Sequence, residues 1–202
     1  MEGLDVDEQR GVPKPASEPA RRVEARDNRA RLLSTARLVF AEHGVDASLR
    51  DIARRTGVGI GTLYRHFPNR DALLEALLRD GLDTLCASAR DLLAAPSPGE
   101  ALTTWLGEYA AGSATYRGLP HAVLAALYDE SSELHSACHQ MNLAAAALVT
   151  RAQRAGAVRT GITAGELCAL VAGIALAGEQ VPDQPDLTAR LLALSANGFL
   201  VR

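Results

Sequence analysis

The sequence has no apolar stretch as long as the roughly 18 residues that a membrane-spanning helix needs. Its N-terminus, MEGLDVDEQRGVPKPASEPA, is acidic and contains prolines, without the apolar core of a secretory signal. The three cysteines are odd in number and far apart, which fits free thiols in a reducing compartment better than a disulfide framework. These absences predict a cytoplasmic protein with no membrane partner.

Sustained alternation of apolar and polar residues, the pattern of a half-buried β-strand, is also missing. Helical spacing of apolar residues fills most of the chain, and 48% hydrophobic residues are enough to bury a core. The fold class is therefore predicted to be all-α, with about nine helices. They are expected near residues 26–43, 48–56, 59–66, 69–94, 99–116, 120–133, 135–156, 164–178 and 186–200.

The net charge of −3 hides an uneven distribution. Residues 1–20 carry two basic and five acidic side chains, and residues 71–202 carry eight and fourteen. Residues 21–70, in contrast, carry eleven basic and five acidic side chains. A basic segment on an acidic body predicts a local anionic partner.

Turn and capping residues mark the helix ends in this basic segment. Residues 1–24 are predicted to be a solvated arm, because three prolines lie among polar residues without periodicity. Gly44 is expected to end the first helix and Gly57 the second, and Asn69 is expected to cap the fourth after a proline. Ser48 and Asp51 have the spacing of a capping box at the start of the second helix.

Residues 48–67 have the layout of a helix-turn-helix, two short helices joined by a glycine-containing turn. The second helix, GIGTLYRH, has the small or polar outward face that entry into the DNA major groove requires, and Leu63 and Phe67 are expected to be its inward anchors. Gly59 and Gly61 would allow close approach to DNA, and Ser48 and Arg50 would form a phosphate site. The candidate DNA-binding residues here are Ser48, Arg50, Gly59, Ile60, Gly61, Thr62, Tyr64, Arg65 and His66.

Arg70 is a further candidate, because a cation in the first turn of a helix opposes the helix dipole. An external phosphate held between the guanidinium and the helix N-terminus would explain it, whereas the alternative is an exposed arginine without a role. The glycines of residues 57–61 do not indicate a nucleotide loop, since a charged helix and not a strand precedes them.

Several of these residues together resemble the TetR family of transcriptional repressors: A-x-x-x-F from Ala36 to Phe40, then Gly44, and IA-x-x-x-GV-x-x-GTLYRHF ending at Phe67. The resemblance implies a three-helix helix-turn-helix DNA-binding domain over residues 25–85, followed by a ligand-binding and dimerisation domain over residues 86–202. It implies a repressor that a small-molecule effector releases from a palindromic double-stranded DNA operator. The alternative is an all-α small-ligand or metal sensor that acts through protein contacts.

The two most apolar predicted helices are the last, residues 164–178 and 186–200. Such a pair either fills its own core or pairs with a second copy, and the residues alone leave both possibilities open. The resemblance implies a homodimer, which also suits a palindromic site. The candidate interface residues are Leu167, Leu170, Val171, Ile174, Leu191, Leu194 and Phe199.

The middle helices contain the tryptophan and three of the four tyrosines. Plain core packing is one explanation for these aromatic residues. The other is an effector cavity, which the resemblance implies. The candidate lining residues are Trp105, Tyr109, Tyr116, His121, Leu124, Tyr128, Met141 and Asn142. The sequence does not identify the effector.

His135 and His139, four residues apart on one predicted helix, have a spacing that can share a metal ion. No firm third ligand accompanies them, so structural or solvent-exposed histidines are the better interpretation. Ser131 and Ser132 lack a nucleophile elbow and an orienting acid. No metal site, cofactor or catalytic residue is predicted, and the protein is not expected to be an enzyme.

Overall fold

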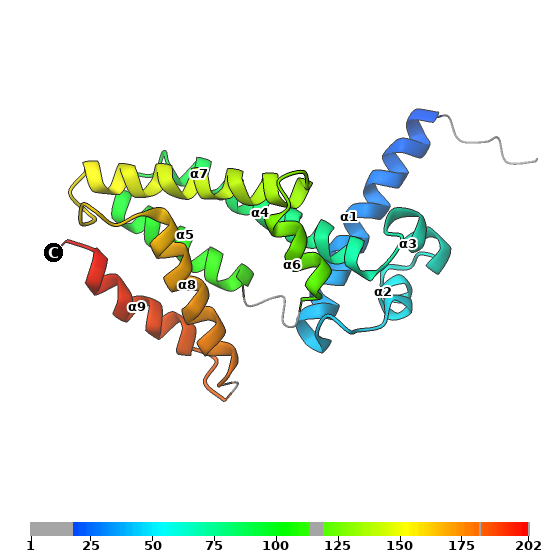
Figure 1. The fold of residues 1–202 in the computed structure, drawn as a ribbon. Helices are drawn as coiled ribbons and strands as arrows, with labels where there is room; N and C mark the ends of the chain where they lie inside the picture. Colours follow the sequence, from blue (N-terminus) through cyan, green and yellow to red (C-terminus); the bar gives the residue numbers. More distant parts are fainter. Residues whose placement is uncertain (1–17, 114–118, 182, 202) are drawn as a thin grey trace, which may run out of the picture.

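The computed structural model describes residues 18–113, 119–181 and 183–201. Over these residues the chain forms nine helices (Figure 1), with one isolated antiparallel bridge between Val158 and Leu200 and no longer strand. The predicted all-α class is confirmed. The helices are α1 (Glu18–His43), α2 (Leu49–Thr56), α3 (Ile60–His66), α4 (Arg70–Leu92), α5 (Pro98–Ser113), α6 (His121–Tyr128), α7 (Glu133–Arg154), α8 (Ala164–Glu179) and α9 (Leu187–Phe199).

Three predicted helix ends of the basic segment are confirmed. Gly44 follows α1 with φ 77°, and Gly57 follows α2 with φ 76°, a left-handed conformation that glycine adopts without strain. The side chain of Asn69 accepts a hydrogen bond of 2.8 Å from the backbone N–H of Ala72 and so caps α4.

The capping box predicted at Ser48 is wrong. Ser48 precedes α2 in an extended conformation, but its side chain makes no capping hydrogen bond. The carboxylate of Asp51 turns to the basic face of its own helix, where it pairs with Arg54 and, at 2.9 Å, with Arg55. Hydrogen bonding from Arg54 lowers the pKa of Asp51. A nearby cation therefore competes successfully with the helix N-terminus for this carboxylate.

The predicted arm is also too long, because α1 already begins at Glu18. Proline is tolerated in the first turn of a helix, so Pro19 does not prevent this start. Val23 is 47% exposed, so this part of α1 buries no apolar stripe whose periodicity the sequence could reveal. Residues 1–17 of the predicted arm lie outside the described residues.

Two apolar cores divide the molecule. The head, which consists of helices α1, α2, α3 and the start of α4, has its own core, with fully buried side chains such as Leu32, Ile52 and Leu63. Burial of each of these side chains stabilises the fold by about 1.5–3 kcal/mol. The head core also includes Val123 of α6 and Leu134 of α7. A second core fills the body, which consists of the end of α4 with α5, α7, α8 and α9. The helix α4 therefore contributes to both cores. Leu82 packs against both cores and Leu85 belongs to the body, so the division falls slightly before the predicted boundary at residue 85.

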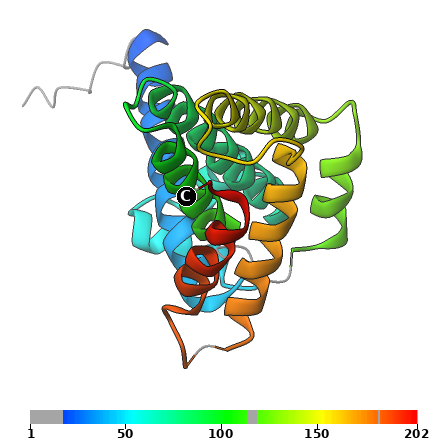
Figure 2. The same cartoon turned by 90° about the vertical axis from the view of Figure 1, so that its left-hand side faces the viewer.

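The helix α4 connects the head to the body and lies along α7 (Figure 1). At the end of the molecule away from α2 and α3 (Figure 1), α8 and α9 lie side by side and pack against α5 (Figures 1 and 2). Among the described helices, none is long and apolar enough to cross a membrane.

Candidate nucleic-acid interface

The start of α2 presents polar groups to the outside. Ser48 and Arg50 are both exposed, and the hydroxyl of Ser48 makes no capping bond. The first N–H groups of a helix have no partner within the helix and favour an anion. This arrangement supports the predicted phosphate site, which remains a prediction.

The turn between α2 and α3 is fixed by buried and half-buried polar contacts. Thr56 is only 5% exposed, and its hydroxyl donates a hydrogen bond of 2.7 Å to the carbonyl of Ile52. The carbonyl of Thr56 accepts a hydrogen bond of 2.6 Å from the guanidinium of Arg31 on α1. In this way α1 holds the last residue of α2, and a buried backbone acceptor at the start of the turn is satisfied.

Two apolar anchors orient the short helix α3. Leu63 and Phe67 are 0% and 2% exposed and belong to the head core. The opposite face carries Gly61, Tyr64 and Arg65, all exposed. A major-groove helix needs such a combination of a fixed inner face and an outer face with little bulk and several donors.

The remaining residues of α3 lie at the edges of this outer face. Ile60, Thr62 and His66 are half-buried, and Ile60 packs partly against the head core. Any DNA contact by Ile60 would therefore use only the exposed part of its side chain. Burial, with the nearby charges of Arg29 and Arg65, lowers the pKa of His66. At neutral pH the imidazole is thus a neutral hydrogen-bond partner and not a cation.

Arg70 has partners within the protein that the sequence did not suggest. Its guanidinium donates hydrogen bonds to the carbonyl of Val45 and, at 2.7 Å, to that of Ala47, both in the loop between α1 and α2. These bonds explain a cation in the first turn of α4 without an external phosphate. They also fix the loop that leads into Ser48, so Arg70 contributes to the interface at least indirectly.

Replacing Arg70 by methionine should lower the free energy of unfolding by about 1–3 kcal/mol, because two partly buried carbonyls lose a charged donor. Urea denaturation of the variant measures this effect. The matched control is methionine in place of Arg154, an exposed side chain in the last turn of α7. Unchanged stability combined with weaker DNA binding would instead assign Arg70 to an external phosphate.

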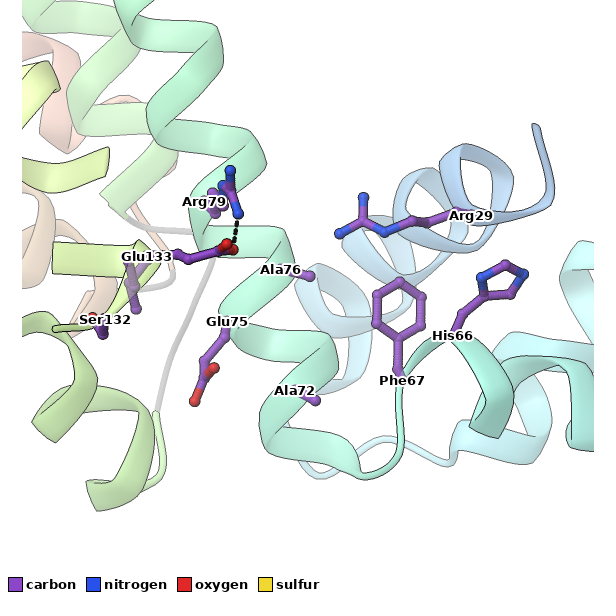
Figure 3. Close-up of a pocket in the computed structure, with 10 residues that line it drawn as sticks. Arg29, His66, Phe67, Ala72, Glu75, Ala76, Arg79, Ser132 and Glu133 are labelled. Carbon is purple, nitrogen blue, oxygen red and sulfur yellow. Dashed lines mark hydrogen bonds and ion pairs between the residues drawn. The ribbon is translucent and has the colours of Figure 1, made fainter. Parts of the chain in front are cut away.

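The structure reveals contacts around α3 that the sequence analysis missed. The guanidinium of Arg29 lies over the ring of Phe67, 5.4 Å from its centroid, and Arg79 of α4 forms an ion pair with Glu133 at the start of α7. These four side chains line a cleft of about 390 Å³ between head and body (Figure 3). The pairs are 38 and 54 residues apart in sequence, so no local pattern could have identified them.

The predicted pocket residues do not form one cavity lining. Trp105 is fully buried and donates its indole N–H to the carbonyl of Leu85 at 2.9 Å, and the ring of Tyr109 stacks on it at 5.7 Å. Met141 is buried in the same core. For these three residues, core packing explains the observed positions.

The other pocket candidates lie elsewhere. Leu124 and Tyr128 are 41% and 83% exposed, so their assignment to an enclosed cavity is wrong in this conformation. His121 and Asn142 are also exposed. The short helix α6 turns only part of its surface toward the core, through Val123, and periodicity over eight residues did not distinguish its faces. Tyr116 lies outside the described residues.

The predicted interface residues of α8 and α9 separate into two groups. The assignment is wrong for the first group, which is at most 8% exposed within the chain: Leu167, Val171, Ile174 and Phe199. The buried face of α8 packs toward α5 and α7, and that of α9 toward α5 and α8, which the sequence alone could not show. Leu191 is half-buried, whereas Leu170 and Leu194 are 44% and 68% exposed and remain candidates.

His135 has a structural contact, since its Nδ1 lies 2.9 Å from the carbonyl oxygen of Leu127. Within the described part of the chain, no three His, Cys, Asp or Glu side chains gather in a possible metal site. The buried Cys168 and half-buried Cys138 are unpaired thiols, and burial raises the pKa of Cys168 to about 11.

Comparisons with known proteins agree with this geometry. Residues 32–77 match the family described as bacterial regulatory proteins, tetR family, and residues 97–201 match the transcriptional regulator SbtR-like C-terminal domain. The solved TetR transcriptional regulator SCO0520 from Streptomyces coelicolor is 38% identical, with 85% of this chain and 98% of that chain covered and a TM-score of 0.71. A TetR regulator from Mycobacterium vanbaalenii is 32% identical, with coverages of 89% and 99% and a TM-score of 0.63.

Among curated proteins, the HTH-type transcriptional repressor KstR2 of Mycolicibacterium smegmatis is 40% identical over 94 residues. That match covers 46% of this chain and 43% of the relative, so the chain spans less than half of the relative's length. The two family matches together account for the head and the body, and the similar solved structures extend over both. The chain is therefore a DNA-binding transcriptional regulator of the TetR family.

Proposed function

We propose that the protein is a homodimeric repressor, released from a palindromic operator by a small ligand bound in its helical body. The observation that carries this proposal is the outer face of α3, where Gly61, Tyr64 and Arg65 are exposed while Leu63 and Phe67 anchor the helix. Repression as the direction of regulation is supported by the name of the M. smegmatis relative. A regulator of this kind acts in the cytoplasm, where bacterial DNA lies.

The outer face of α8 and α9 supports the dimer. Between Glu166 and Glu179, α8 carries no charged residue, although its side chains at Leu170 and Leu176 are 44% and 59% exposed. Leu194 of the neighbouring α9 is 68% exposed. An apolar surface that is this accessible favours association, and a two-fold dimer would present two copies of α3 to a palindrome.

Contacts between body and head supply a route for ligand control. Val123 of α6 and Leu134 of α7 are buried in the head core, and the Arg79–Glu133 ion pair joins α4 to the start of α7. A ligand that displaces α6 or α7 would therefore change the packing of the head. It shifts the protein from DNA only if it binds the DNA-incompetent arrangement more tightly.

Selection from a random duplex library tests the DNA-binding part of the proposal, with fluorescence anisotropy of the enriched sequence as the quantitative step. The expected operator is palindromic. Its affinity should fall about 10²–10³-fold between 50 and 200 mM salt, because several basic side chains per dimer displace counterions from phosphates. Failure to enrich any sequence would contradict operator binding and favour a sensor that acts through protein contacts.

A further inference from the structure

The N-terminal half of α1 extends beyond the part of the helix that packs in the head. From Arg22 to Arg31 the side chains are exposed, except the half-buried Asn28, and the first buried residue of α1 is Leu32. Figure 1 shows this half running past α3, at the end of the molecule far from α9. Because these side chains are not buried, apolar packing does not explain the extension. An isolated helical segment of this length is only marginally stable in water.

Charge is segregated around this extension. Arg22, Arg26 and Arg29 follow a spacing of four and three residues, which places them on one stripe of the helix. The same stripe continues as the buried residues Leu33 and Phe40. The basic stripe, Arg22–Arg26–Arg29, is thus the prolongation of the face that α1 turns toward the head.

The acidic residues of the extension avoid this stripe. Glu24 and Asp27 are two and five residues after Arg22, which corresponds to rotations of about 200° and 140° around the helix. They therefore lie on the opposite side from the basic stripe. Because the two signs are on different faces, the basic face can approach an anion without bringing the carboxylates along.

The basic stripe begins directly beside the recognition helix. Arg29 contacts the ring of Phe67, which follows α3 (Figure 3), and burial together with the charge of Arg29 lowers the pKa of His66. Arg65 is exposed on the same turn of α3 as His66. The stripe and the end of α3 consequently place two basic side chains, Arg29 and Arg65, near His66.

We infer that Arg26 contacts the phosphate backbone of duplex DNA outside the segment contacted by α3, while Arg29 stays over the ring of Phe67 and joins the stripe to the end of α3. Arg22 and Arg29 are seven residues apart, so the stripe spans about 10 Å along the helix axis, the axial length of about three phosphates on one strand. The inference rests on the proposed operator binding and adds a flanking contact to it. The inferred partner of the exposed part of α1 is therefore the DNA adjacent to each half-site.

The test compares two duplexes that contain the selected operator, one ending at its boundary and one with ten further base pairs on each side. Wild-type protein should bind the longer duplex at least fivefold more tightly. The Arg26→Gln variant and the Arg26→Gln/Arg29→Gln variant should bind both duplexes about equally. For Arg26→Gln, the slope of log K against log salt on the longer duplex should decrease by about 2, since a dimer loses two phosphate contacts.

The matched control, Glu24→Gln/Asp27→Asn, raises the net charge on the opposite face of the same segment, and it should keep the wild-type preference for the longer duplex. The single Arg26 variant excludes loss of the Arg29–Phe67 contact as the cause, and circular dichroism checks the helix content of every variant. A persistent flank preference in Arg26→Gln would overturn the inference. Absence of wild-type binding to either duplex would instead contradict the proposed function itself.

Discussion

Replacing Gly61 by glutamine should abolish specific operator binding while leaving the free protein at least as stable as wild type. Gly61 is exposed on α3, and a Cβ built there meets nothing within 4 Å. Glutamine is a better helix former than glycine, so the free energy of unfolding should rise by up to about 1 kcal/mol. Nothing in the isolated protein therefore requires glycine at this position.

The DNA would require it. A glutamine side chain on the outer face of α3 would occupy the space through which the helix backbone approaches the base edges. We expect affinity for the selected operator to fall at least about 100-fold, toward the non-specific level. Anisotropy titrations measure this loss, and urea denaturation measures the stability.

The control is Gly112→Gln on α5, where the glycine is also exposed and a Cβ also meets nothing within 4 Å. It should leave operator affinity unchanged. Operator binding that survives in Gly61→Gln would show that α3 does not approach DNA through this face. An equal loss in both variants would point to an indirect effect on folding.

Local signals were sufficient for much of the head. Gly44, Gly57 and Asn69 determine where α1, α2 and α4 end or begin, through a left-handed turn or a side-chain cap that involves only near neighbours. The apolar spacing of Leu63 and Phe67 likewise identified the inner face of α3, which the head core confirms. Such features depend on a few consecutive residues and can be inferred from the sequence.

The boundary between α6 and α7 shows where local interpretation failed. The sequence prediction extended the sixth helix to residue 133, whereas α6 ends at Tyr128. The carboxylate of Asp129 accepts hydrogen bonds from the N–H and hydroxyl of Ser131, at 2.9 and 2.7 Å, and Ser132 caps α7. This polar turn carries no glycine or proline, so the missing signal was the hydrogen-bonding capacity of Asp and Ser.

The predicted site residues depended more strongly on tertiary structure. Arg70 was expected to bind a phosphate, but its observed partners, Val45 and Ala47, are more than 20 residues away in sequence. On α8, Val171 and Leu170 are adjacent in sequence and equally apolar, yet one is buried and the other exposed. Only the packing of α8 on α5 and α7 decides which of them can meet a second copy.

The difference between buried and exposed leucines on α8 and α9 allows a second large effect to be predicted, on dimerisation. Replacing Leu194 by aspartate should convert the proposed dimer to a monomer, because Leu194 is 68% exposed on the outer face of α9. In a two-fold interface the substitution occurs twice, and two unpaired carboxylates would be removed from water. We expect the dimer dissociation constant to rise at least about 1000-fold, equivalent to about 4 kcal/mol. Sedimentation velocity at micromolar concentration measures the change.

Operator affinity should fall together with dimerisation, because each monomer retains only one recognition helix. The control is Leu143→Asp on α7, where the leucine is 53% exposed and lies outside the proposed interface. It introduces the same charge on a comparable surface and should leave both the dimer and operator binding intact. A Leu194→Asp protein that remains dimeric would place the interface on another surface. A monomeric variant with wild-type operator affinity would show that one head is sufficient, and the palindromic operator would then lose its structural basis.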